Sequence, residues 1–266
     1  MPRFRQGSQR LIQEVSHSLQ NLQTFHEHPL EAVKPACTRA EKTSGAFFCS
    51  FFMQFISQLE QQLRKPLPGR SVQAEMSVIP TENNHFTPRS GARNAGVLSL
   101  FFPKNSVWHL ALIRRAFHEK DHHSRQISFP GGSYEERDGS FEKTALRETE
   151  EEINVHQSKV QIIGKLTEIY IPVSNFNVHP YVGFMDEYPD FKPQQGEVDA
   201  VLEIPVDVLI DDGNRLKMPI ETRGYKIPDV PVFQFDEDVV WGATAMMLNE
   251  LIAIIKPSMP IPSMLV

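Results

Sequence analysis

Cysteine is scarce in this chain of 266 residues, where it occurs only as Cys37 and Cys49. Both lie in the first fifty residues, and no Cys/Cys/His spacing typical of a zinc site accompanies them. We therefore predict neither a structural zinc site nor a disulfide framework. A reducing cytosol is the default compartment for such a composition, so the expected location is cytoplasmic.

Long apolar runs and a strong basic charge are missing as well. The apolar run at 45–56 has about 12 residues, whereas a membrane-spanning helix needs roughly 20, so we predict no membrane partner. The net charge of -6 gives no overall basic field, and we expect no nucleic-acid polymer as a partner. A small anionic substrate held through metal ions is compatible with this charge.

The first fifty residues differ from the rest in charge and pattern. They carry a net charge of +2, against -8 for the remainder, and Pro29, Pro35 and Gly45 interrupt any helix after residue 25. We interpret residues 1–50 as a poorly ordered extension. Two alternatives stay open: a targeting peptide, which Glu14 argues against, and a true translation start at Met53.

Beyond this segment the apolar pattern predicts a mixture of helices and strands. No Gly-x-Gly-x-x-Gly follows a strand-like run, which argues against a doubly wound nucleotide-binding fold. Helices are predicted from Met53 to Pro66, from near Ser140, and at Gly242–Ile255, where Pro257 stops the last one. Strands are predicted at 97–102, 108–113, 126–129, 160–163, 178–184, 198–204 and 232–235.

The segment from Thr144 to Ile153 carries an unusual arrangement of acids. On a helix its apolar residues form one sector, and Glu152 falls inside that sector instead of on the solvated face. Glu148 lies at the edge of the sector, Glu151 further round on the same side, and Arg147 opposite the apolar stripe.

Glu148, Glu151 and Glu152 are spaced at i, i+3 and i+4, so their carboxylates lie within a few ångströms of one another. Like charges this close raise one another's pKa unless a cation lies between them. Mg²⁺ or Mn²⁺ prefers such oxygen ligands, although a surface helix rich in glutamate can show the same spacing. Arg147 is placed to orient the carboxylates by bidentate pairing.

The pattern resembles the Nudix box, G-x5-E-x7-R-E-U-x-E-E-x-G-U, where U is aliphatic. Arg147-Glu148, Glu151-Glu152 and Val155 match its second half with the right spacing, behind the corner Phe129-Pro130-Gly131-Gly132. The resemblance implies an α+β fold, a Nudix-like α/β/α sandwich with a mixed β-sheet and a catalytic strand-loop-helix. It implies a Nudix domain at 51–266 and a metal-dependent pyrophosphohydrolase, in which water attacks a diphosphate linked to another group.

Further residues resemble the coenzyme A pyrophosphatase branch of that family. The stretch His123–Gly132 is similar to its H-x-G-Q-x-x-F-P-G-G motif, with Arg125 in place of the first glycine. Additional agreement lies outside the box, at Pro66–Gly69, His179–Gly183, Glu197-Val198 and Trp241–Ala245. Such members cleave coenzyme A or its thioesters to 3′,5′-adenosine bisphosphate and 4′-phosphopantetheine or its acyl derivative.

The box itself is altered at three positions. The interval from Gly132 to Arg147 is one residue longer than usual, so the first glutamate of the box falls on Gly139 and only Asp138 or Glu136 can substitute. Thr149 takes an aliphatic position. Asn154 replaces glycine, and asparagine tolerates the left-handed conformation that ends helices.

The resemblance implies a role for each residue of the site. Glu148, Glu151 and Glu152 would bind Mg²⁺ or Mn²⁺, and Arg147 would orient them. The water's proton would pass to Glu152 or to Glu197, because loop glutamates often act as a base in this superfamily. Contacts to substrate are expected from Gly131, Gly132, Arg115 and Arg125.

Two alternatives differ in function. One is a Nudix hydrolase of another nucleoside diphosphate derivative, such as ADP-ribose or a dinucleotide. The other is a non-catalytic module that senses a nucleotide, which would have little need of all four residues Arg147, Glu148, Glu151 and Glu152. The expected partner is a small nucleoside diphosphate of the coenzyme A type, and the family resemblance makes a homodimer plausible.

Overall fold

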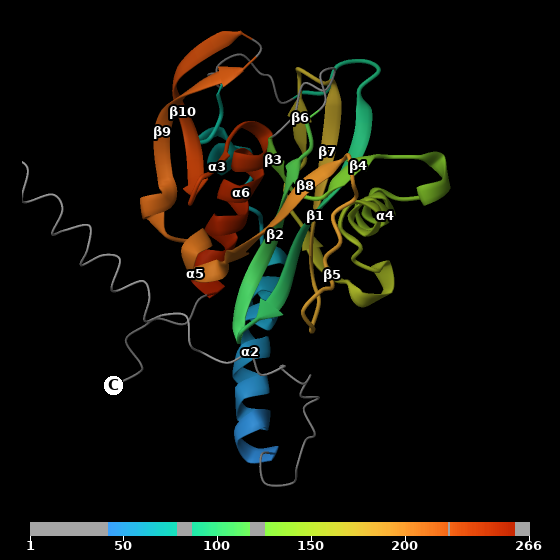
Figure 1. Ribbon diagram of the computed structural model, residues 1–266, viewed down its shortest axis with the longest axis vertical. Helices are drawn as coiled ribbons and strands as arrows, with labels where there is room; N and C mark the ends of the chain where they lie inside the picture. The colour runs from blue at the N-terminus through green and yellow to red at the C-terminus, as the bar shows by residue number, and fades with distance from the viewer. Residues whose placement is uncertain (1–41, 79–86, 118–125, 223, 259–266) are drawn as a thin grey trace, which may run out of the picture. The chain divides into compact units, whose positions relative to one another are not determined.

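The computed structural model describes residues 42–78, 87–117, 126–222 and 224–258 (Figure 1). Its contacts divide the chain into two units, Met1–Ala46 and Phe47–Val266, and the fold below is that of the second. The predictions for residues 1–41 fall outside the described residues. In the described part of the chain, no helix is long and apolar enough to cross a membrane.

The centre of the fold is an eight-stranded mixed sheet. Its main order is β3-β2-β1-β7-β5, and β4, β6 and β8 pair with β1, β7 and β2. The β1–β7 pair is parallel and the others are antiparallel, which confirms the mixed sheet. Its strands are β1 Arg93–Lys104, β2 Val107–Arg115, β3 Ile127–Ser128, β4 Gly131–Ser133, β5 Gln161–Lys165, β6 Ile169–Ile171, β7 Phe176–Phe184 and β8 Val198–Pro205.

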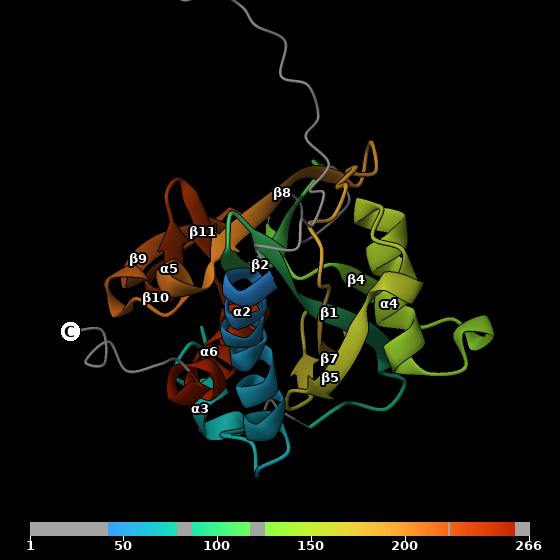
Figure 2. The same cartoon turned by 90° about the horizontal axis from the view of Figure 1, so that it is seen from below.

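Helices cover both faces of this sheet (Figures 1 and 2). Successive side chains of β1 point to opposite faces. One face packs Leu98 and Leu100 against Ala145 and Ile153 of α4 (Phe141–Ile153). The other face contributes to a larger core with α2 (Lys42–Leu63) and α6 (Gly242–Ile255), whose members include Phe55, Leu59, Phe101, Trp108, Leu110, Leu248 and Leu251. The α/β/α sandwich is therefore confirmed.

A second sheet of three antiparallel strands lies beside α6 (Figure 1). It consists of β9 Arg215–Thr222, β10 Tyr225–Phe235 and β11 Asp238–Val240. Strand β11 adjoins the central sheet through the ion pair of Asp238 with Arg114 of β2, at 2.6 Å. The remaining helices are short: α3 Arg70–Ala74 and α5 Val206–Leu209, with 3-10 turns at Glu136–Asp138, Gln157–Lys159, Asp212–Asn214 and Lys256–Ser258.

Several local features differ from the sequence prediction, which also missed the short elements β6, β11, α3 and α5. Helix α2 begins at Lys42 and includes Gly45, so the prediction that Gly45 interrupts the helix was wrong. Strand β4 was missed because two of its three residues are glycines, which are depleted in strands. Strand β9 was missed although Leu216, Met218 and Ile220 alternate with other residues, because Pro219 within the run is unfavourable in a strand.

Helix α4 lies unusually close to β1. A Cβ on Gly96 would collide with the backbone oxygen of Phe141, so only glycine permits this approach. The contact holds the first turn of α4 beside β4, which pairs with the same part of β1.

Candidate active site

The boundaries of α4 are set by its terminal residues. Ser140 caps the helix by accepting a hydrogen bond from the backbone N–H of Lys143 at 3.2 Å. Asn154 ends it in the left-handed conformation, with φ of 61°, as the sequence predicted. The carboxylates of α4 are thereby fixed relative to β4.

Glu152 is buried, with a relative exposure of 3%. This confirms its predicted position in the apolar sector of α4. Its Oε2 accepts a hydrogen bond from the backbone N–H of Gly131 at 2.8 Å, and Nη1 of Arg115 lies 3.8 Å from its Oε1. Burial raises the pKa of Glu152 to about 7, against the lowering effects of the Gly131 N–H and Arg115. Gly131, which was expected to contact substrate, thus donates its N–H to a carboxylate of α4 in the structure.

Glu148 lies against the second glycine of the corner. A Cβ on Gly132 would lie 2.5 Å from the carboxyl carbon of Glu148, so only a residue without a side chain allows this contact. Burial raises the pKa of Glu148, the neighbouring Arg147 lowers it, and repulsion from Glu151 and Glu197 raises it further.

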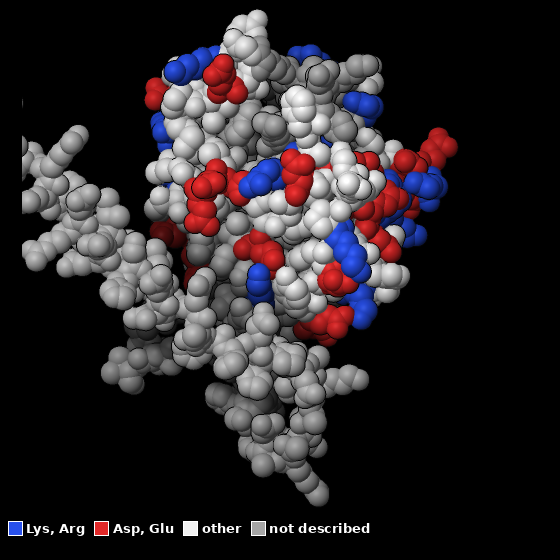
Figure 3. All heavy atoms as spheres, in the orientation of Figure 1, with Lys and Arg blue, Asp and Glu red and all other residues white. Residues whose placement is uncertain are grey.

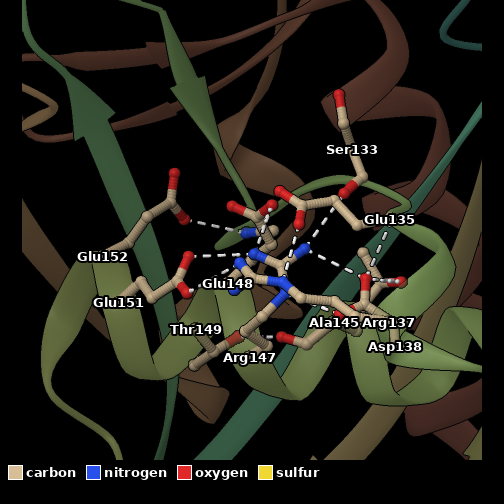
Figure 4. Close-up of polar contacts among 12 residues, drawn as sticks. Ser133, Glu135, Arg137, Asp138, Ala145, Arg147, Glu148, Thr149, Glu151 and Glu152 are labelled. Carbon is tan, nitrogen blue, oxygen red and sulfur yellow. Dashed lines mark hydrogen bonds and ion pairs between the residues drawn. The ribbon is translucent and has the colours of Figure 1, made fainter.

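Arg147 joins α4 to the loop that precedes it (Figure 4). Its guanidinium donates to Asp138, with Nε 2.7 Å from Oδ1 and Nη2 3.0 Å from Oδ2. Nη2 also donates to the backbone oxygen of Ser133, and Nη1 lies 3.0 Å from Glu148 and 2.9 Å from Glu151. The guanidinium thus lies between the corner, the preceding loop and two helix carboxylates.

Asp138 was one of two acids that could substitute for the missing glutamate of the box. Its side chain is 3% exposed, whereas Glu136 is exposed. It accepts bonds from Thr144 Oγ1 at 2.8 Å and from the backbone N–H of Glu135 at 3.0 Å. Arg147 and these donors hold the pKa of Asp138 well below its usual range. Because Asp138 covers it, the Arg147 side chain is only 12% exposed, although its helical position predicted a solvent-facing residue.

The other predicted site residues come from separate segments. Glu197 precedes β8 and is exposed, and its charge raises the pKa of both Glu148 and Glu152, so it belongs to the same electrostatic site. Its backbone oxygen accepts from the N–H of Ala116 at 2.8 Å, just beyond Arg115. Arg125 lies outside the described residues.

The carboxylates of the site supply the oxygen donors that Mg²⁺ and Mn²⁺ prefer. Acidic and basic side chains gather over α4 at the right of Figure 3. Glu148, Glu152 and Glu197 repel one another, which a cation would relieve. In the residues that the structure describes, no three His, Cys, Asp or Glu side chains converge closely enough to hold a metal ion, because Glu148 and Glu151 turn toward Arg147.

The substitution Gly132→Ala should impair catalysis and leave the stability of the fold nearly unchanged. The added Cβ would displace the end of a flexible side chain, Glu148, and the backbone of Gly132 has no positive φ. We expect a stability change below about 1 kcal/mol but a loss of hydrolysis of about tenfold or more. The matched control is Gly213→Ala, where the new Cβ would approach the carboxylate of Asp211 at 3.2 Å. Urea unfolding and steady-state kinetics measure both effects, and full activity of Gly132→Ala would contradict a role for Glu148.

Residues that the sequence linked to the same branch have structural contacts elsewhere in the fold and at the start of α4. Gly69 donates its N–H to Glu250 at 3.0 Å, and this fully buried carboxylate also accepts from Gln73 and Thr167. His179 of β7 stacks on Phe141, the first residue of α4, with 3.9 Å between ring centroids. No pattern in the sequence pointed to Glu250, because its partners are distant along the chain.

The comparisons with known proteins agree with this geometry. The family model of the NUDIX domain matches residues 92–221. The uncharacterized Nudix hydrolase NudL of Escherichia coli O1:K1 is 33% identical over 142 residues, which are 53% of this chain and 72% of that protein. NudL of Shigella boydii serotype 18 matches equally.

Two solved structures are also similar. The crystal structure of the Nudix hydrolase RenU from M. smegmatis has a TM-score of 0.45 at 14% identity and covers 66% of this chain and 96% of that one. The NUDIX domain of Shewanella oneidensis NrtR, complexed with ADP ribose, has a TM-score of 0.37 at 20% identity. The match covers 46% of this chain and 78% of that one.

The matches identify the chain as a pyrophosphohydrolase of a class that generally uses divalent metal ions. The chain belongs to the Nudix hydrolase family.

Proposed function

We propose that this enzyme hydrolyses the diphosphate of coenzyme A or its thioesters, giving 3′,5′-adenosine bisphosphate and 4′-phosphopantetheine or its acyl derivative. One observation supports this most directly. The Phe-Pro-Gly-Gly corner, which belongs to the motif resembling the coenzyme A branch, contacts the carboxylates of α4: Glu152 accepts the N–H of Gly131, and Glu148 lies against Gly132. The branch motif and the catalytic helix therefore form one site.

Glu148, Glu151 and Glu152 are the proposed ligands of Mg²⁺ or Mn²⁺. Bound ions would neutralise the diphosphate oxygens and favour deprotonation of the attacking water. Glu148 and Glu151 each pair one carboxylate oxygen with Arg147, so they would bind the ions through the other oxygen, and Asp138 keeps the guanidinium in place. Arg147 is thus a positioning residue.

The protein's groups complete the reaction. Water adds to one phosphorus, the bridging P–O bond breaks, and the water's proton passes to Glu152 or Glu197. Glu152 is held by Gly131, whereas Glu197 is exposed at the start of β8. Arg115, at the end of β2 beside Glu152, is placed to bind a phosphate oxygen.

Product analysis tests this proposal. Purified protein is incubated with coenzyme A, acetyl-coenzyme A or ADP-ribose in Mg²⁺ or Mn²⁺, and the products are separated by chromatography. We expect metal-dependent release of 3′,5′-adenosine bisphosphate, which a chelator abolishes. Cleavage of ADP-ribose but not of coenzyme A would reject coenzyme A as the substrate and would still support diphosphate hydrolysis as the reaction. No turnover of any diphosphate by metal-loaded protein would instead indicate a nucleotide-sensing module.

A further inference from the structure

A pocket of about 920 Å³ lies between the central sheet and the three-stranded sheet. One wall is the face of the central sheet that carries Val97 and Phe129, and α6 contributes Met246 and Met247. The paired ends of β9 and β10 form the opposite wall. In Figure 1 this hairpin end lies at the top, level with β6 and β7.

The walls are largely apolar. The side chains around the space include Ile169, Ile171, Phe176, Ile227, Met246 and Met247. At the mouth, Val173 is 53% and Tyr225 is 74% exposed, although both are large apolar or aromatic residues. An apolar cavity of this size with an exposed apolar rim is typical of a ligand site.

The pocket is continuous with the active site. Arg115, Gly131 and Gly132 line one end of it. These are the residues that Glu152 and Glu148 contact, so a molecule with its diphosphate at the glycines extends directly into the pocket.

The chemistry of the walls determines which part of a substrate fits. A bisphosphorylated nucleoside carries charges and polar groups, and their burial among aliphatic side chains without partners is costly. An alkyl chain gains free energy from the same burial. The nucleoside end must therefore lie outside. The pantetheine arm that follows the diphosphate carries two amides, which the polar lining residues Gln126, Ser128 and Ser133 can bind, and the acyl chain beyond it meets the apolar walls.

We propose that this pocket binds an apolar acyl chain of the substrate, and that the β9–β10 hairpin is the element that selects for it. The inference rests on the proposed function and adds a substrate preference: medium- or long-chain thioesters are cleaved in preference to acetyl-coenzyme A. Ile227 of β10 and Ile171 of β6 face this pocket from opposite elements and are specificity-determining residues.

A series of thioesters tests the preference. Each fully buried methylene group should raise kcat/KM by about fourfold. We therefore expect kcat/KM to be at least about tenfold higher for octanoyl- than for acetyl-coenzyme A. Ile227→Asn lowers that ratio by about tenfold, because it places an amide in the pocket. Leu216→Asn on the neighbouring strand is the matched control, since Leu216 is 41% exposed, lies outside the pocket and should leave the ratio unchanged. Equal kcat/KM for all chain lengths, with adenosine bisphosphate released, would overturn the inference and leave the proposed function standing.

A binding experiment is independent of turnover. Trp241 lines the pocket, whereas Trp108, the other tryptophan of the chain, is buried in the core. Octanoyl-pantetheine, which has no diphosphate, should change the fluorescence of the wild-type protein but not of Trp241→Phe. If no coenzyme A compound is cleaved, the proposed function fails, but this titration still tests whether the pocket binds an acyl chain. A saturable change in fluorescence would support an acyl site. The absence of any change would reject it.

Discussion

Glu152→Gln lowers kcat for the diphosphate substrate by about 10²–10⁴-fold, the usual contribution of a positioned proton acceptor, with a further loss if the ion is bound less well. The substitution preserves the shape of the side chain, and the amide oxygen of glutamine can still accept the N–H of Gly131. The fold should survive. Burial disfavours the charged carboxylate, so the variant should unfold at the same temperature as the wild type or above it.

Glu142→Gln is the matched control, because Glu142 is an exposed acid in the first turn of the same helix. It should keep wild-type kcat. Steady-state kinetics with saturating metal and a thermal melt measure both properties. A Glu152→Gln enzyme within about threefold of wild type would show that Glu152 neither accepts the proton nor binds an essential ion. Glu197→Gln would then be the next variant to measure, since its charge reaches the same carboxylates.

The arrangement of α4 was predictable because it depends on local chemistry. Helical periodicity placed Glu152 in the apolar sector, and the structure buries it. Arg147 was predicted to pair with the helix carboxylates, and it forms ion pairs with Glu148 and Glu151. Asn154 ends that helix because asparagine tolerates a positive φ. Each of these predictions concerns residues within one helix or at its ends.

Features that depend on distant segments were not predictable. The choice between Asp138 and Glu136 depends on how a short 3-10 turn folds over α4, and neither spacing nor composition determines that fold. The pocket is lined by residues from 77 to 247, and one wall belongs to the β9–β10 hairpin, whose strand β9 is interrupted in the sequence by Pro219. Only the three-dimensional arrangement reveals that this wall is continuous with the catalytic glycines.

Asp138→Asn should destabilise the fold by about 1.5–3 kcal/mol, the usual contribution of hydrogen bonds to a charged group, because Arg147 loses Asp138 but keeps its ion pairs with Glu148 and Glu151. The Asp138 and Arg147 side chains are 3% and 12% exposed, so water can replace little of what is lost. Asn also weakens the bonds from Thr144 and from the backbone of Glu135. Asp190→Asn, which removes the exposed partner of Lys192, is the control and should cost less than about 1 kcal/mol.

The pH dependence of this stability loss tests whether the loss arises from the charge of Asp138. Its folded-state pKa lies below the unfolded value of about 3.9, so its contribution is complete above that pH and is lost as the pH falls toward the folded-state value. The free energies of unfolding of wild type and Asp138→Asn should therefore differ by a nearly constant amount from about pH 7 to pH 5, and the difference should shrink progressively below about pH 4. Urea unfolding at pH 3, 5 and 7 measures this. A difference that stays constant across these pH values would assign the loss to hydrogen-bond geometry alone. Retention of full activity at pH 7 would show that Arg147 does not need Asp138 to position the carboxylates.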